Sequence, residues 1–201
     1  MKRLILTFAA LLVLAGCLSA PKPPTQLTAP AKFQVNFNTS KGLIVVDVNR
    51  ADAPIGADRL YNLVKAGYFT ECRFFRIVAG FVVQFGVAST PPVTKAWNIQ
   101  IKDDKVIKSN TRGVLSFAAS GDPDTRTTQL FFNLGDNARL DKVGFAGIGQ
   151  ISKGLEIVDS LYAGDRELPD QAKIERIGNS YLQKEFPNLD YIKTATITVL
   201  K

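Results

Sequence analysis

The feature that most constrains the fold is the stretch of residues 74–86, a long apolar run interrupted only by Arg76 and Gln84. Two short strands joined by a turn at residues 79–80 fit this run. Burying a guanidinium among phenylalanine, isoleucine and valine is unfavourable unless another group needs the charge there. Arg76 therefore either lies at a strand edge and pairs with an acid, or serves a binding or catalytic site.

The N-terminus has the pattern of an export signal. Lys2 and Arg3 are followed by an uncharged apolar run over residues 4–16, which is shorter than the roughly 20 residues of a membrane-spanning helix. A basic start, a short apolar run and small residues at its end are typical of a secretory signal peptide. The letters LAGC at residues 14–17 resemble a bacterial lipobox, which implies lipidation of Cys17. The alternative is an ordinary signal peptide with an incidental cysteine.

These features predict three regions. Residues 1–16 are the lipoprotein signal peptide, residues 17–32 a lipidated tether, and residues 33–201 one folded domain. The tether contains four prolines and lacks apolar periodicity, which favours an extended conformation. We expect a membrane-anchored lipoprotein on the periplasmic face of the cell envelope. Leu18 follows the lipidation site, and it is not the aspartate of an inner-membrane retention signal, which favours the outer membrane in a Gram-negative bacterium.

Composition excludes several classes of protein. The chain has no histidine, which excludes Ser-His-Asp and Cys-His catalysis and histidine-ligated metals. Apart from Cys17, Cys72 is alone, so the domain has no internal disulfide framework. Without Lys2 and Arg3, 23 basic residues face 18 acidic ones, with no run of five like charges. This dispersed excess does not indicate a nucleic-acid partner, and we expect neither a metal nor another cofactor.

Short strands dominate the expected domain. Residues 33–38 alternate apolar and polar side chains, and residues 43–48 follow a turn, so the pair is expected to form a hairpin. Pro54, leucines on one face and a closing Gly67 predict a helix between those two residues. Residues 167–177 have no chemistry that the sequence reveals, beyond being polar and exposed. Further strands are expected at residues 113–118, 129–134, 144–151 and 194–200 and near Trp97 and Ile99, with helices at 152–161 and 179–186.

This succession of elements predicts a mainly β fold. Many short strands, two main helices and a strand near each end favour a closed antiparallel barrel capped by the helices. The pattern by itself does not identify the fold more specifically than this class.

Three segments carry a more specific signal. Residues 74–86 follow the pattern Phe-x-Arg-Ile-Val-x-Gly-Phe-Val-x-Gln-x-Gly. Residues 113–118 read GVLSFA and are followed by TTQLFFN at 127–133, and residues 136–151 contain DNARLD and FAGIGQI. In this order and spacing they resemble the cyclophilin family of peptidyl-prolyl cis–trans isomerases, over nearly the whole domain. The resemblance implies a closed eight-stranded antiparallel barrel with a helix at each end.

The resemblance also implies a site. Arg76 matches the catalytic arginine of the family. Arg139 stands where many members carry a tryptophan that helps to hold cyclosporin, so we expect weak binding of that drug. The resemblance assigns substrate binding to Phe81, Val82, Gln84, Ala118, Ala119, Gln129, Phe131, Leu140 and Phe145.

The chemistry of prolyl isomerisation suits these residue types. Resonance gives the peptide bond a rotation barrier of about 18–20 kcal/mol. As the bond twists, the prolyl nitrogen gains a lone pair, which a permanently charged donor binds more strongly in the twisted state. The reaction needs no histidine and no metal.

The sequence leaves two main functions open. The first is a monomeric prolyl isomerase that acts on X–Pro bonds of exported polypeptides and assists their folding. The second is a non-catalytic chaperone or scaffold lipoprotein whose pocket binds proline-containing segments. A buried cation favours the first, because docking alone does not require one. The pocket residues make a third function, that of a purely structural lipoprotein of the cell envelope, a poor fit.

Overall fold

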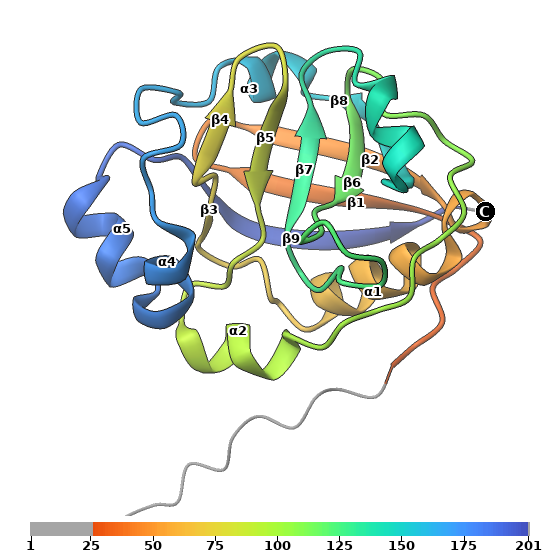
Figure 1. Cartoon of the computed structure of the whole chain (residues 1–201), viewed down its shortest axis with the longest axis horizontal. Helices are drawn as coiled ribbons and strands as arrows, with labels where there is room; N and C mark the ends of the chain where they lie inside the picture. The colour runs from red at the N-terminus through yellow and green to blue at the C-terminus, as the bar shows by residue number, and fades with distance from the viewer. Residues whose placement is uncertain (1–25, 201) are drawn as a thin grey trace, which may run out of the picture.

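The protein is represented by a computed structural model that describes residues 26–200 (Figure 1). The predicted signal peptide, the predicted lipidation site Cys17 and most of the predicted tether lie outside the described residues. Within residues 26–200, no helix has the length and apolar character needed to cross a membrane.

One antiparallel sheet of nine strands forms the body of the domain, in the order β3-β9-β1-β2-β8-β6-β7-β5-β4. Strands β4, β5, β7 and β6 lie in front, and β1, β2 and β9 run across behind them (Figure 1), so the sheet curls strongly on itself. The strands are β1 (Lys32–Thr39), β2 (Leu43–Asn49), β3 (Cys72–Arg73), β4 (Arg76–Val78), β5 (Val82–Phe85), β6 (Val114–Phe117), β7 (Leu130–Asn133), β8 (Gly147–Lys153) and β9 (Tyr191–Val199).

The mainly β, antiparallel architecture confirms the predicted fold class, whereas the closed eight-stranded ladder needs correction. The described sheet has nine strands, and its edge strands β3 and β4 do not pair with each other. They follow one another in the chain, separated only by Phe74 and Phe75. The chain itself therefore joins the two edges where a ladder of hydrogen bonds would otherwise close the barrel.

The interior of the curled sheet is an aromatic core. Phe37, Phe69, Phe85 and Phe132 are fully buried. The rings of Phe85 and Phe132 stack at 5.2 Å between centroids, and Phe37 meets Phe85 edge-on at 5.7 Å. Such pairs contribute about 0.5–1.5 kcal/mol beyond their buried area. The predicted hairpin of β1 and β2 brings Phe37 into this core, through the alternation visible in the sequence.

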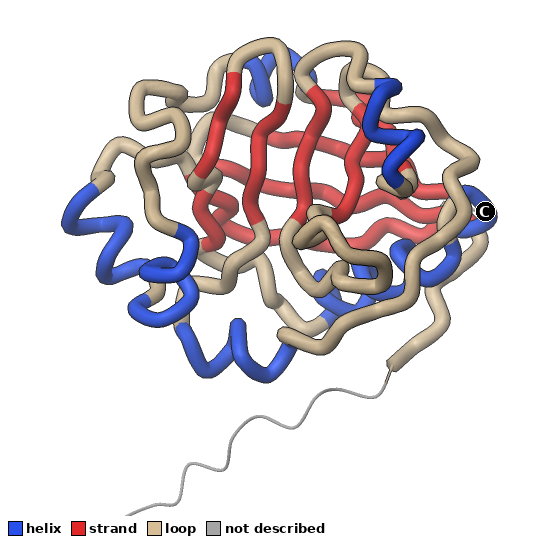
Figure 2. The backbone as a smooth tube through the Cα atoms, in the orientation of Figure 1, coloured by secondary structure: helices blue, strands red, loops and turns tan. Residues whose placement is uncertain are grey.

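Five α-helices surround the sheet among the described residues (Figure 2). Those at residues 54–65, 155–159 and 179–185 fall in segments predicted to be helical, and those at 91–97 and 171–177 were not predicted. The segment near Trp97, predicted as a strand, is helical instead, because paired prolines at its start favour a first helical turn. Strand β8 continues through Lys153, which shortens the helix predicted from residue 152. The helices are α1 (Pro54–Lys65), α2 (Pro91–Trp97), α3 (Leu155–Asp159), α4 (Gln171–Ile177) and α5 (Asn179–Glu185), with 3₁₀ turns η1 (Arg50–Asp52) and η2 (Ala138–Val143).

The start of α1 is capped from a distant loop. Its own N-cap, Ala53, has no side-chain acceptor, but the Asp104 carboxylate accepts hydrogen bonds from the backbone N–H groups of Ile55 and Gly56, each at 2.8 Å. The buried Arg126 guanidinium pairs with this carboxylate at 3.1 Å. An acid at a helix N-terminus satisfies otherwise unpaired donors, so this contact fastens two surface loops to α1.

The chain also contacts α1 just before β1. The backbone N–H of Leu27 donates to the Asn62 side-chain oxygen at 2.9 Å, and that of Ala29 donates to Asp58 at 2.8 Å. Ala29 is buried. Residues 27–31, at the end of the predicted tether, thus lie against the domain.

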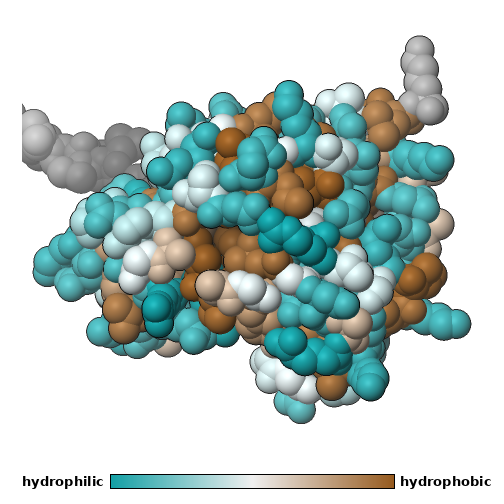
Figure 3. Space-filling model, turned by 90° about the horizontal axis from the view of Figure 1, so that it is seen from above, coloured by the Kyte–Doolittle hydropathy of each residue, from teal (hydrophilic) through white to brown (hydrophobic). Residues whose placement is uncertain are grey.

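The end of the molecule that carries the β4–β5 turn has a hollow surface. Seen from above, hydrophobic side chains gather in this hollow and hydrophilic side chains border it (Figure 3).

Candidate active site

The β4–β5 hairpin positions Arg76. Gly80 in its turn has a φ of +71°, a conformation that favours glycine. Arg76 lies directly opposite Gln84 on β5, and Gln84 lies opposite Phe131 on β7. Directly opposite residues of antiparallel strands point to the same face of the sheet, so register alone places these three side chains in one row.

Most of the residues assigned by resemblance line one pocket of about 360 Å³. Nine of the ten predicted site residues are in its wall, and Gln171 of α4, which the sequence did not indicate, joins them. The tenth, Gln129, lines an adjoining pocket of about 570 Å³. The structure thus brings the predicted residues together, while their individual roles stay predictions. The nine are Arg76, Phe81, Val82, Gln84, Ala118, Ala119, Phe131, Leu140 and Phe145.

Arg76 fits both interpretations of the sequence. It lies on an edge strand and pairs with an acid, since its Nε donates to Glu167 Oε1 at 2.7 Å and its Nη2 lies 2.5 Å from the same oxygen. Its Nη1 also donates to Gln84 Oε1 at 3.2 Å, and its side chain remains about a quarter exposed in the pocket wall. The ion pair and the pocket are therefore not exclusive alternatives.

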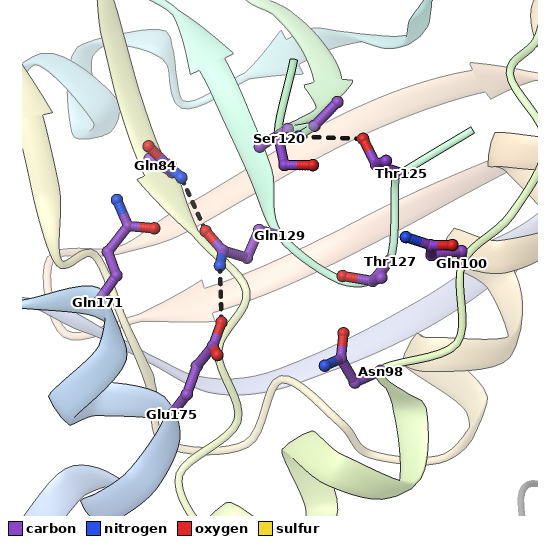
Figure 4. A pocket seen from close by; sticks show the side chains of 11 residues that line it. Gln84, Asn98, Gln100, Ser120, Thr125, Thr127, Gln129, Gln171 and Glu175 are labelled. Atoms are coloured by element: carbon purple, nitrogen blue, oxygen red, sulfur yellow. Dashed lines mark hydrogen bonds between the residues drawn. The ribbon is translucent and has the colours of Figure 1, made fainter. Parts of the chain in front are cut away.

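A directional chain of hydrogen bonds leads away from Arg76. An arginine only donates, so the Gln84 carbonyl must face it. Gln84 Nε2 then donates to Gln129 Oε1 at 2.8 Å, and Gln129 Nε2 donates to Glu175 Oε1 at 3.4 Å (Figure 4). The chain begins at a cation and ends at a carboxylate, which fixes the orientation of both amides.

A second cation lies at the rim of the pocket. The Arg139 guanidinium carbon is 4.7 Å from the centre of the Phe81 ring, and that of Arg76 is 5.9 Å from the same centre. An arginine over an aromatic face is attracted by the ring quadrupole. Phe81 is therefore held by the two cations, as well as contributing apolar surface to the pocket.

Buried amides hold the opposite wall. The Asn137 side-chain nitrogen donates to the backbone oxygen of Phe81 and to Asn133 Oδ1, each at 2.8 Å. The Asn110 side-chain nitrogen donates to Asp141 Oδ1 and to the backbone oxygen of Phe145, each at 2.7 Å. These bonds fix η2, which carries Leu140, to the sheet.

The acid in this wall is strongly hydrogen-bonded. Burial alone would raise the pKa of the Asp141 carboxyl, but hydrogen bonds from Ser109 and Asn110 outweigh it and hold the pKa below its usual range. Asp141 therefore acts as a fixed acceptor that locks the η2 turn.

The sequence did not reveal the contribution of residues 163–178. Glu167 contacts Arg76, Gln171 lines both pockets, and Glu175 contacts Gln129. The one available signal was the spacing of four residues between Gln171 and Glu175, which places helical side chains on one face, whereas Glu167 lies in a turn before α4. Within residues 26–200, no group of three or more His, Cys, Asp or Glu side chains gathers as a metal site would require.

Comparison with known proteins assigns the family. Residues 34–179 match the model of the family described as cyclophilin type peptidyl-prolyl cis-trans isomerase/CLD. The chain therefore belongs to the cyclophilin-type peptidyl-prolyl cis–trans isomerase family, as the sequence motifs predicted.

Curated relatives carry the same activity in their names. The chain is 32% identical over 139 residues to peptidyl-prolyl cis-trans isomerase A of Dickeya dadantii, covering 66% of this chain and 73% of the relative. It is also 32% identical over 138 residues to a peptidyl-prolyl cis-trans isomerase of Acinetobacter baylyi, with the same coverage.

Solved structures share the fold. A cyclophilin-type isomerase of Cryptosporidium parvum superposes with a TM-score of 0.62 at 19% identity, covering 85% of this chain and 99% of the other. The structure of that protein determined in the presence of the dipeptide Ala-Pro gives a TM-score of 0.64 at 18% identity, with coverages of 83% and 99%. At this identity the likeness supports the fold alone.

Proposed function

We propose that this protein catalyses cis–trans isomerisation of X–Pro bonds in exported polypeptides, as a monomer held to the cell envelope by lipid on Cys17. Family membership supports the isomerase chemistry. The main observation in favour of catalysis is the position of Arg76, whose cation lies in the wall of a pocket in which seven of the ten lining residues have apolar side chains. The structure of the Cryptosporidium relative in the presence of Ala-Pro supports proline-containing segments as the substrate class.

In the proposed mechanism the apolar wall binds the proline ring and excludes water. Phe131 and Phe145 meet edge-on at 5.8 Å, and with Leu140 they form a surface suited to an uncharged ring. The twisted amide is less polar than the planar one, so a dry wall favours twisting relative to water.

Arg76 supplies the interaction that is stronger in the twisted state. An arginine has five N–H donors, and the contacts to Gln84 and Glu167 leave others to face a substrate. A remaining N–H is available to donate to the prolyl nitrogen as its lone pair develops. Lowering the barrier by about 7 kcal/mol would accelerate exchange about 10⁵-fold.

The alternative is a docking module that binds proline-containing segments without catalysis. The Arg76–Glu167 ion pair favours it, because the carboxylate offsets part of the charge that catalysis would use.

One experiment separates these functions. Exchange of an Ala-Pro peptide is measured by NMR with the wild type, with Arg76→Ala, and with Arg112→Ala, which removes an arginine outside the pocket. Catalysis predicts exchange in the wild type and in Arg112→Ala and its loss in Arg76→Ala. Equal exchange in all three would refute the catalytic role, and binding without exchange would favour the docking module.

The proposed anchor needs its own test. The full chain is expressed in a Gram-negative host with labelled palmitate, beside a Cys17→Ser variant. We expect label and membrane association only in the wild type, recovered with the outer membrane. A wild-type protein that is exported, unlabelled and soluble would contradict lipidation.

A further inference from the structure

A second wall of the site comes from the segment that precedes and forms α4. Gln171 and Glu175 lie one turn apart on α4 and project toward Gln129 (Figure 4). The helix is fixed from its other side, because Ile174 is buried in a small separate core with Phe75 and Leu182. This face of α4 is therefore held against the site by the packing of its opposite face.

The pocket beside this wall is lined by polar groups. Within the part of the chain that the structure describes, Glu175 is the one ionisable side chain in its lining. Amides and hydroxyls fill most of the remainder, and several of them face α4 from the opposite side (Figure 4). They are Gln84, Asn98, Gln100, Ser120, Thr125, Thr127, Gln129 and Gln171.

The two carboxylates of this wall differ in their partners. The charge of Glu167 is offset by Arg76, whereas Glu175 accepts only from the neutral amide of Gln129, at 3.4 Å. Among residues 26–200, Glu175 forms no salt bridge and its second oxygen has no hydrogen-bond donor. The pocket thus carries one uncompensated negative charge surrounded by hydrogen-bonding groups.

We propose that this pocket binds a lysine or arginine side chain of the client polypeptide, close in sequence to the isomerised proline, and that Glu175 selects it. The proposal rests on the proposed function. The two pockets share Gln84, Ala118, Ala119 and Gln171, and an extended chain advances about 3.3–3.6 Å per residue. A residue only a few positions from the proline therefore reaches the polar pocket.

The chemistry of the lining suits a basic side chain. A lysine presents three N–H donors on a flexible stem, and an arginine presents five. The Glu175 carboxylate accepts one of them with charge assistance, while side-chain oxygens of the opposite wall accept others. An acidic client side chain would meet like charge at the same position.

Peptide exchange rates test the selectivity. Alanine-based peptides with one proline carry lysine, norleucine or glutamate at each position from three before to three after it, and kcat/KM for exchange is measured by NMR. At one position we expect lysine to exceed norleucine about threefold, the size of an exposed ion pair, and glutamate to fall below both. The advantage should shrink as salt rises from about 20 mM to about 0.5 M, because exposed charges are screened.

Variants assign the effect to Glu175. Glu175→Gln should abolish the lysine advantage, and Glu175→Lys should transfer the advantage to glutamate at the same position. The matched control is Glu156→Gln on α3, which removes one negative charge outside both pockets and should keep the wild-type ratio. Because every result is a ratio between peptides, a change in the amount of active protein does not affect it.

Two results would overturn the proposal: equal rates for lysine and norleucine at every position, or a lysine advantage that persists in Glu175→Gln. If the wild type exchanges no peptide, including the uncharged one, the proposed function fails instead. Dissociation constants from chemical-shift titration of the same peptides would then test the pocket independently, with the same lysine preference expected.

Discussion

The two walls of the site are built in different ways. The sheet wall consists of Arg76, Gln84 and Phe131, which lie opposite one another on β4, β5 and β7. The helical wall consists of Glu167, Gln171 and Glu175, whose exposed side chains come from one segment outside the sheet. In the sheet wall, backbone hydrogen bonds set the spacing of the side chains. The helical wall is tied to the sheet by one backbone hydrogen bond, from the Ile77 N–H to the Arg166 oxygen at 3.1 Å, and otherwise depends on side-chain contacts and on the buried Ile174.

This difference suggests a division of tasks. Groups that must meet a transition state with small positional error are best placed on strands, whose ladder cannot shift by one residue without turning each side chain to the other face. Groups that recognise a client residue near the proline tolerate more variation in their position. Changes in the sheet wall should therefore impair turnover, and changes in the helical wall should alter selectivity.

The largest effect is expected at Arg76. Removal of one preorganised donor to a transition state typically costs 10²–10³ in rate, so Arg76→Ala should lower kcat/KM for an Ala-Pro peptide by about that factor. Arg76→Lys keeps the charge but lacks the fork that contacts Gln84 and Glu167, and should recover only a small part of the activity. Full activity in Arg76→Lys would show that charge alone suffices and would weaken the comparison of the two walls.

The next effect concerns the support of the apolar pocket. Asn137→Ala removes the donor to Phe81 and Asn133 and leaves buried acceptors unpaired, which costs about 1–3 kcal/mol. Urea unfolding should show this loss in the free energy of unfolding, while the exposed control Lys142→Ala stays within about 0.5 kcal/mol of wild type. An unchanged midpoint in Asn137→Ala would mean that water replaces the lost donor.

Glu167 links the two walls, and its removal should have a smaller effect. Glu167→Ala frees two nitrogens of Arg76, so we expect kcat to fall a few-fold through loss of orientation, with KM nearly unchanged. Glu167→Gln retains an acceptor and should restore part of the rate, and the distant Glu185→Ala should match wild type. A faster Glu167→Ala enzyme would instead show that the carboxylate opposes catalysis by offsetting the cation.

The smallest effect is expected from the thiol behind the sheet wall. Cys72 is fully buried, its Sγ accepts from the Gly86 N–H at 3.3 Å, and burial raises its pKa to about 12. Iodoacetamide at pH 8 should leave Cys72 almost unmodified in the folded protein. In a Gln171→Cys variant the added thiol, on the helical wall, should react promptly. Equal labelling of both sites would mean that the sheet wall opens as readily as the helical wall.

The same thiol predicts a pH dependence. The folded-state pKa of Cys72 lies above the value of about 8.5 for an unfolded thiol. Its contribution to stability is therefore complete below about pH 8.5 and declines as pH rises toward 12, because the unfolded state releases its proton first. The free energy of unfolding, measured from pH 8 to pH 11, should fall less in Cys72→Ala than in wild type. If the free energy of unfolding fell equally with pH in Cys72→Ala and in wild type, the assignment of this pH dependence to Cys72 would be contradicted.

Much of the fold followed from local patterns. The run at residues 74–86, the alternation at residues 33–38 and the proline-started helix at Pro54 each depend on spacing between near neighbours, which the chain carries in itself. The family motifs also identified the residues that gather in the apolar pocket, with Gln129 in the adjoining one. The prediction of a strand near Trp97 is wrong. The neighbouring prolines favour the start of a helix there, and this preference is stronger than the strand propensity of the aromatic residue.

By itself, the sequence determined the antiparallel β class, the β4–β5 hairpin and the presence of a cation in an apolar setting. Only the tertiary structure decided what surrounds that cation. Arg76 and Glu167 are 91 positions apart, and no periodicity relates residues at such a distance. Their contact, the chain of amides to Glu175 and the placement of β3 and β4 at opposite edges of the sheet arise only when the sheet has curled and α4 has packed against it.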